Sequence, residues 1–240
     1  MDNLLKTVIK AHGGWERWQK VTKLNAHVSI GGGIWHLKGW PGVFTDANVV
    51  INPRRQHIEF SPFGNLGQHI LVEPDRVAIV ATDGNIIEQR GSPRQAFEGH
   101  SIQTPWDALH LAYFSGYAMW GYLTAPYLFA YPGFHAQEIE PWDENGEIWR
   151  RLKVTFPAEI HAHCSEQVFY YDSKGLLRRN DYRVDIIGSG TTSAHYSDEH
   201  KSFGGMVFPT NRRVYSIGAD NKPILERVLV SIHVHEVDVG

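Results

Sequence analysis

One uncharged, aromatic segment near the middle of the chain restricts its possible folds more than any other feature. Residues 109–122 read LHLAYFSGYAMWGY, with no charged side chain and five aromatic rings. Thr104 is a suitable N-cap, Asp107 favours the N-terminal end of a helix, and Gly121 and Pro126 end it. The segment is too short and too rich in small and polar residues to span a membrane. A helix that is apolar on every side is predicted to be buried.

Short strand-like runs separated by turn residues fill most of the remaining chain. They lie at 24–30, 34–40, 43–51, 55–60, 69–73, 76–81, 86–90, 135–141, 147–156, 160–171, 176–187, 191–199, 211–217 and 224–237. A first helix is expected over residues 3–19, interrupted by Gly13-Gly14. The short connections favour antiparallel pairing. We predict a mainly β fold with helices (α+β): a curved antiparallel half-barrel meander of about 11 strands, wrapped around the buried helix, in one domain over residues 1–240.

Charge and composition limit the kinds of partner and the cellular location expected for the chain. The net charge of −3 offers no broad positive field for nucleic acid, so nucleic-acid binding is not expected. A single cysteine, Cys164, excludes an internal disulfide and any CxxC motif. The amino terminus lacks the basic start and unbroken apolar core of a signal peptide. These features predict a cytoplasmic protein with no membrane insertion.

The order of elements resembles that of the LolA/LolB-like superfamily of lipoprotein carriers. The residues that carry the resemblance are Ala11-His12-Gly13-Gly14, Trp18, Val21, Leu24, Asp172-Ser173-Lys174-Gly175-Leu176-Leu177, Asp181-Tyr182-Arg183-Val184 and Phe208-Pro209. The resemblance implies an unclosed antiparallel barrel that surrounds helices and leaves an apolar cavity between them. It extends to the VioE-like members of the superfamily, in which a similar cavity serves small-molecule chemistry without a cofactor.

Strand parity predicts which side chains face the interior. Even positions are the more apolar ones in residues 148–156, 162–170 and 176–186, so the even face should point inward. A type I turn at 172–175, a tight turn at 157–159 and the Gly188-Ser189-Gly190 turn then set the register. The predicted inner pairs are Arg150–Glu166, Glu166–Tyr182, Tyr182–Tyr196, Asn180–Asp198 and Arg178–His200.

This polar row has two interpretations. In the first, Arg150 and Glu166 form a pair that only satisfies its own charges within the sheet. In the second, the row lies at the base of an apolar pocket: Glu166 acts as acid or base, Arg150 stabilises developing negative charge, and Tyr182 or Tyr196 donates a proton. The remaining members of the row, Asn180, Asp198, Arg178 and His200, would then contact the ligand.

The uncharged helix offers the opposite wall of such a pocket. Its candidate ligand-binding residues are His110, Tyr113, Tyr117 and Trp120, which lie on one face or beside it. The alternative is that these side chains are ordinary core. Small residues between them, such as Gly116 and Ala118, permit close approach or leave room for a ligand.

Other chemistries find less support. His161, His163 and Glu166 have a spacing seen at metal sites, and His233, His235 and Glu236 repeat it. Parity places His161 and His163 on the face opposite Glu166, with His163 across from Asp185 on the outer surface, so no metal site is predicted. Cys164 is more typical of a small core residue than of a nucleophile. No nucleotide-binding or nucleophile-elbow motif occurs, and no cofactor is expected.

The sequence therefore predicts that the chain binds a small hydrophobic or aromatic molecule between sheet and helix. The polar row favours cofactor-independent acid–base chemistry of the isomerase, lyase, cyclase or hydrolase type. The alternatives are a non-catalytic carrier or sensor of hydrophobic ligands and an interaction protein with an exposed apolar patch. The sequence leaves the identity of the ligand and the oligomeric state open.

Overall fold

The protein is built on a single large antiparallel sheet, described here by a computed structural model of residues 2–64, 67–188 and 192–240. The strands are β1 (Leu24–Gly31), β2 (Phe44–Ile51), β3 (Ile58–Ser61), β4 (His69–Val72), β5 (Arg76–Val80), β6 (Ile86–Gly91), β7 (His135–Glu144), β8 (Glu147–Thr155), β9 (Glu166–Tyr171), β10 (Leu177–Arg183), β11 (Thr192–Phe203), β12 (Met206–Ser216) and β13 (Val230–Val239). The helices are α1 (Asn3–Ala11), α2 (Trp15–Trp18), α3 (Gly33–Leu37) and α4 (Ala108–Thr124), with 3-10 turns η1 (Gln95–Phe97), η2 (Tyr127–Ala130) and η3 (Asp185–Ile187).

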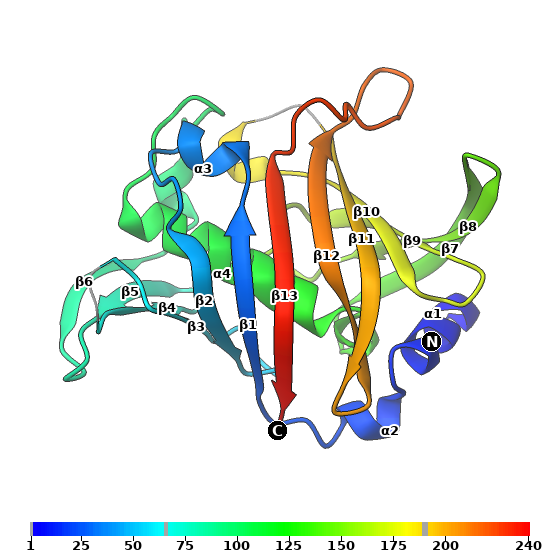
Figure 1. Cartoon of the computed structure of the whole chain (residues 1–240), viewed down its shortest axis with the longest axis horizontal. Helices are drawn as coiled ribbons and strands as arrows, with labels where there is room; N and C mark the ends of the chain where they lie inside the picture. Colours follow the sequence, from blue (N-terminus) through cyan, green and yellow to red (C-terminus); the bar gives the residue numbers. More distant parts are fainter. Residues whose placement is uncertain (1, 65–66, 189–191) are drawn as a thin grey trace.

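Two meanders join at the ends of the chain to make this sheet. The strand order is β6-β5-β4-β3-β2-β1-β13-β12-β11-β10-β9-β8-β7, so the last strand pairs with the first. Figure 1 shows the sheet curving, with β6 and β7 as its two free edges. An open, curved, antiparallel sheet with few helices confirms the predicted fold class, with 13 strands in place of about 11.

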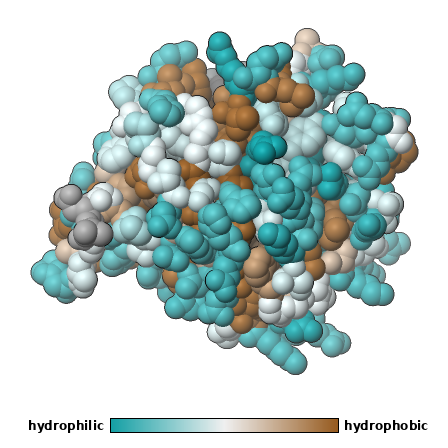
Figure 2. Space-filling view, in the orientation of Figure 1, coloured by the Kyte–Doolittle hydropathy of each residue, from teal (hydrophilic) through white to brown (hydrophobic). Residues whose placement is uncertain are grey.

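Alternation of side chains fixes which face of the central strands is inside. In β1 the buried residues are Leu24, Ala26, Val28 and Ile30, with partly exposed residues between them. The opposite face, seen over β12 and β13 in Figure 2, is largely hydrophilic. This pattern is typical of an antiparallel sheet with one face on the core.

Helix α4 is buried over most of its length, and it lies across the inner face of the sheet (Figure 1). Its N-cap is Asp107 rather than the predicted Thr104: the Asp107 carboxylate accepts from the backbone N–H of His110 at 2.8 Å. The helix ends at Thr124, one residue before the segment Ala125-Pro126. No helix in the described ranges combines the length and hydropathy needed to cross a membrane.

Gly116 allows α4 to approach β4 closely. A Cβ atom at this position would lie 2.6 Å from Cγ2 of Val72. Gly121, in the same helix, has no atom within 4 Å of the equivalent position. The two glycines therefore have different roles, since only Gly116 is required by packing.

Near the chain start, one segment differs from the sequence prediction and another agrees with it. The strand predicted at 34–40 is instead helix α3, because a helical turn places both Ile34 and Trp35 in the core. The Trp35 indole also donates to the Gly31 carbonyl at 2.9 Å, which holds the turn against β1. The helix predicted over 3–19 is divided into α1 and α2 by Gly13-Gly14, as the prediction of an interruption there implied.

The predicted register of the polar row is wrong at both sides of β9. Residues 157–165 form a loop rather than a tight turn, so Glu166 pairs with Thr155, and Arg150 pairs with Tyr171. The loop is closed by a hydrogen bond from the Phe156 N–H to the Ser165 carbonyl at 2.8 Å. As a result, the odd face of β9 points inward instead of the predicted even face.

Two register changes move β10 from its predicted pairing: a β-bulge opposite β9 and an offset opposite β11. The turn after Asp172 forms as predicted, but a register shift at Arg178 places Tyr170 opposite Arg179. A bulge adds one residue to one strand only, so every later pair moves by one. Tyr196 also pairs with Arg179, while Tyr182 pairs with Ser193. The predicted Gly188-Ser189-Gly190 turn lies partly outside the described residues.

We predict that Gly116→Ala lowers the free energy of unfolding by ~1–3 kcal/mol, because the added methyl group overlaps Val72. Gly121→Ala is the matched control and should raise it by ~0.5–1 kcal/mol, through a lower backbone entropy of the unfolded chain. Urea denaturation of the two variants measures both effects. Equal destabilisation by both substitutions would contradict the packing assigned to Gly116.

Candidate functional site: a cavity between sheet and helix

A cavity of about 360 Å³ lies between the inner face of the sheet and α4. This volume is within the range of small-molecule sites. Its walls are mainly apolar. They come from β1, β12 and β13 on one side and from α4 on the other, and include Ile30, Val214, Val230, Ile232, Phe114, Ala118 and Met119.

The loop of residues 101–103 forms part of the cavity wall, and a buried lysine fixes its position. The Lys38 ammonium donates to the carbonyl oxygens of Ser101, Ile102 and Thr104 at 3.1, 2.7 and 2.8 Å. It also lies 4.8 Å from the centre of the Trp106 ring. Burial lowers the pKa of Lys38 to about 8, and the three carbonyl groups provide the hydrogen bonds that a buried ammonium requires.

A hydrogen-bonded group of three side chains closes one end of the cavity. His163 Nε2 lies 2.7 Å from the Tyr122 hydroxyl, which in turn lies 3.0 Å from the Tyr182 hydroxyl. The His163 and Tyr182 rings stack with centroids 4.1 Å apart. His163 Nδ1 also contacts the Tyr117 hydroxyl at 3.2 Å. These side chains form one polar region of a mainly apolar cavity, whose other polar lining residues are Ser101, Gln103, Ser115, Ser193 and Ser216.

Burial keeps these polar groups neutral. It lowers the pKa of His163 from 6.5 to about 3 and raises the pKa of Tyr122 from 10.0 to about 12. Burial also raises the pKa of Tyr182 well above its ordinary value. Efficient general acid–base catalysis requires a pKa near the working pH, and these shifts go the other way. The three groups are suited to donating and accepting hydrogen bonds.

Two of the three predicted catalytic residues lie away from the cavity. Glu166 has 55% of its side chain exposed and pairs with Lys153 at 3.2 Å. Arg150 forms two hydrogen bonds of 2.7 Å to the Glu138 carboxylate. Only Tyr182 lines the cavity. The Arg150–Glu166 pair is absent because the loop at 157–165 is longer than the predicted turn.

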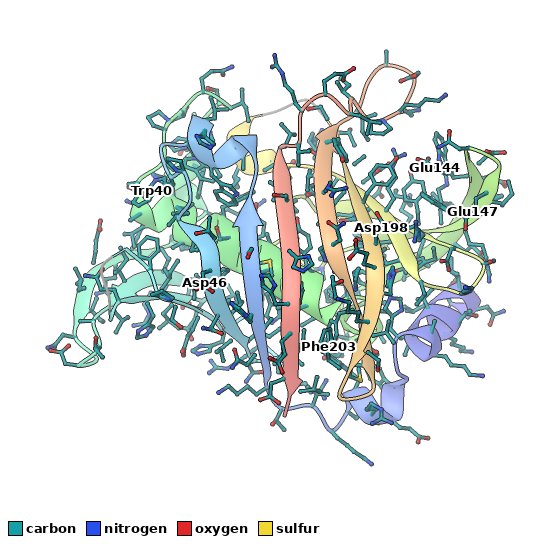
Figure 3. All side chains as sticks on the ribbon, viewed as in Figure 1. Trp40, Asp46, Glu144, Glu147, Asp198 and Phe203 are labelled. Carbon is teal, nitrogen blue, oxygen red and sulfur yellow. The ribbon has the colours of Figure 1, made fainter. Side chains whose placement is uncertain are left out.

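The predicted ligand-binding residues on the sheet are dispersed. Arg178 pairs with Asp198 at 2.7 Å rather than with His200. Figure 3 shows Asp198 on β11 and Glu144 at the end of the β7–β8 hairpin. The Tyr196 hydroxyl donates to Glu144 at 2.6 Å. Asn180 is buried and pairs with His195 rather than with Asp198, and His200 packs against His12.

The predicted residues on α4 surround the cavity without lining it. His110 belongs to the N-terminal cap of the helix, and Tyr113 bonds His161 Nδ1 at 2.8 Å. Tyr117 supports His163, as described above. The Trp120 indole donates to the Asn52 carbonyl at 2.8 Å. These four side chains hold the helix and its neighbours in place.

Sequence reasoning missed His163, Tyr122 and Arg212. Strand parity predicts that His163 lies across from Asp185 on the outer surface. Its carbonyl does accept from the Asp185 N–H at 3.0 Å, but its side chain is buried inside. Strand parity offered a signal for Arg212, which shares the inner face of β12 with Phe208 and Val214.

Among the residues that the structure describes, no three His, Cys, Asp or Glu side chains form a group that could hold a metal ion. His161 is engaged with Tyr113, and Cys164 is buried, with its thiol directed to the Glu166 carbonyl at 3.0 Å.

We predict that His163 makes stability depend on pH. Its pKa is lower in the folded chain, so protonation favours unfolding, and stability is lost as the pH falls from about 6.5 toward about 3. A single group of this kind contributes at most ~1.4 kcal/mol per pH unit. His163→Gln should therefore flatten the decline of unfolding free energy between pH 6 and pH 4. The same substitution at the exposed His135 is the control, and an unchanged slope in His163→Gln would refute the assignment.

Comparisons with known proteins identify the fold. Neither protein-family profiles nor curated proteins give a match. Among solved structures, a LolA superfamily protein from Nitrosomonas europaea matches with a TM-score of 0.51 and 9% identity, covering 99% of this chain and 92% of the other. A DUF1329 family protein from Desulfovibrio piger matches with a TM-score of 0.52 and 10% identity, covering 98% and 91%.

A third solved structure, named for an outer membrane lipoprotein-sorting protein domain from Vibrio parahaemolyticus, has a TM-score of 0.54 and 8% identity, covering 98% of this chain and 90% of the other. All three matches extend over nearly the whole described chain. They establish the LolA-like fold that the sequence resemblance implied.

Proposed function

We propose that the protein binds one small hydrophobic molecule in the cavity between the sheet and α4, and acts as a carrier or sensor of that molecule. The observation that carries the proposal is the cavity itself: about 360 Å³ with mainly apolar walls and a polar group at one end. Sites of this kind bury an apolar ligand and orient it with a few hydrogen bonds.

The polar end supports this orientation. Tyr122, Tyr182 and His163 offer hydroxyl and imidazole groups that already satisfy each other. A ligand can add a hydrogen bond there without leaving a buried group unpaired. One solved structure with this fold is named for lipoprotein sorting. From this likeness we propose only that the LolA-like sheet of this chain holds an apolar guest.

Binding is favoured over turnover for two reasons. Glu166 and Arg150, the predicted acid–base pair, lie outside the cavity. The titratable groups at its polar end have pKa values far from neutral, which disfavours proton transfer. The catalytic alternative remains a prediction from the sequence.

The proposal predicts that the protein takes up an uncharged apolar dye such as 1-N-phenylnaphthylamine, with one dye per chain. Val214→Phe places a ring inside the cavity and should weaken dye binding by about tenfold or more, since it removes the space that the dye needs. Val207→Phe, the same change on the outward face of β12, should leave binding unchanged. Fluorescence titration measures both variants.

Two results would argue against the proposal. The first is a folded wild-type protein that takes up no dye. The second is a Val214→Phe variant that binds the dye as tightly as the wild type, because the dye would then occupy another site.

A further inference from the structure

Arg212 is a buried cation without a carboxylate partner. Its side chain points to the inside of the sheet from β12 and is 4% exposed. Nη1 donates to Ser197 Oγ at 3.3 Å, and Nη2 donates to the Tyr122 carbonyl at 3.1 Å. Within residues 2–64, 67–188 and 192–240, no Asp or Glu oxygen lies within 4 Å of this guanidinium, and the remaining six residues include no acidic side chain.

A second buried arginine shows how the same sheet satisfies such a charge elsewhere. Arg179 is 1% exposed, and its guanidinium binds Asp181 at 2.7 Å and Glu144 at 3.4 Å. A buried charge normally has a partner of this kind because its desolvation costs several kcal/mol. Arg212 lacks the compensation that Arg179 has.

Arg212 lines a small cavity of about 30 Å³ at the polar end of the main one. The two cavities share Ala118, Tyr122 and His163 as lining residues. Ile232, the β13 partner of Arg212, lines the main cavity, and so does Val214, the next inward residue of β12. The guanidinium therefore lies just beyond the Tyr122 ring, whose centre is 5.3 Å away.

The charge of Arg212 has no counterpart in either cavity. Among the described lining residues of both, Arg212 is the one side chain with a permanent charge, and no Asp, Glu or Lys is present. His195, diagonally across from Arg212 on β11, is fully buried, and neither ring nitrogen has a described hydrogen-bond partner. Burial, together with the Arg212 charge, lowers the pKa of His195 well below its ordinary value. Arg212 and His195 thus form an electropositive, incompletely bonded region.

We propose that the ligand is an amphipathic monoanion, a carboxylate with one apolar tail, whose head pairs with Arg212 while its tail fills the main cavity. The proposal requires the Tyr122 side chain, which lines both cavities, to move aside at the expense of its hydrogen bonds to His163 and Tyr182. This inference rests on the proposed function and adds the charge and polarity of the guest. A carboxylate would supply the charge-assisted hydrogen bonds that Arg212 does not find within the chain.

Competition with bound 1-N-phenylnaphthylamine tests the proposal with three probes of equal tail length: dodecanoate, 1-dodecanol and dodecylamine. For the wild type we expect dodecanoate to displace the dye at a concentration about tenfold or more below that of dodecanol, with dodecylamine the weakest. Equal competition by the acid and the alcohol would overturn the anion assignment and leave the proposed function standing. A protein that takes up neither the dye nor any of the three probes would refute both the anion assignment and the proposed function.

Arg212→Met removes the charge and keeps a long, flexible side chain. It should bind the dye as the wild type does but lose the preference of dodecanoate over dodecanol, so that the ratio falls to about one. Arg212→Lys should retain part of the preference. Arg213→Met, the same change at the neighbouring exposed residue, is the control and should keep the full ratio.

The stability of Arg212→Met separates a ligand-binding role from a structural one. Replacement of an unpaired buried charge by an apolar side chain is expected to keep or raise the free energy of unfolding. A variant that is folded, equally stable and without acid preference supports the proposal. A structural role predicts a different result: Arg212→Met is strongly destabilised, and the preference for the acid persists in Arg212→Lys and in any Arg212→Met that folds. That result would show that Arg212 holds the sheet and helix together instead.

Discussion

The packing of α4 against the inner face of the sheet is the interaction on which the other features depend. A helix with no charged residue between Leu109 and Tyr122 has no side that favours water, so its stability requires apolar surface all around it. Close approach at Gly116 brings the helix against Val72, and the sheet curves past it on both sides. Because contact is tight at β4 and looser toward β12 and β13, the space left beyond Phe114 and Met119 becomes the cavity.

The polar groups of the interior follow from the same arrangement. Burial beneath α4 keeps His163 and Tyr122 neutral, and each satisfies the other. Lys38 retains its hydrogen bonds through backbone carbonyls at the cavity wall. Arg212 differs from these groups because its guanidinium carries five N–H donors and makes two hydrogen bonds within the described residues, with no carboxylate among its partners. In our proposal, a carboxylate guest supplies the charge-assisted hydrogen bonds that Arg212 does not find within the described residues.

Much of the fold was predictable from local patterns, whereas the site was not. The uncharged segment at 109–122 predicted α4, and alternating runs predicted most of the strands. Both signals depend on the periodicity of consecutive residues, which the sequence shows directly. The polar row failed because each of its pairs depended on turn lengths. The loop at 157–165 moved Glu166 to the surface and brought His163 inward, and the bulge at Arg178 shifted the pairs between β9 and β10. Such insertions are small in sequence and leave no periodic signal.

The most direct test of the ligand-binding account is the mass of the protein purified from its own cells, measured by mass spectrometry under native and denaturing conditions. The account predicts a native mass that exceeds the 27.2 kDa chain by one small molecule, released on denaturation and identifiable after extraction. An amphipathic acid in the extract would agree with the role of Arg212. Equal masses in both conditions, from a protein that also takes up no apolar compound added to it, would contradict the account.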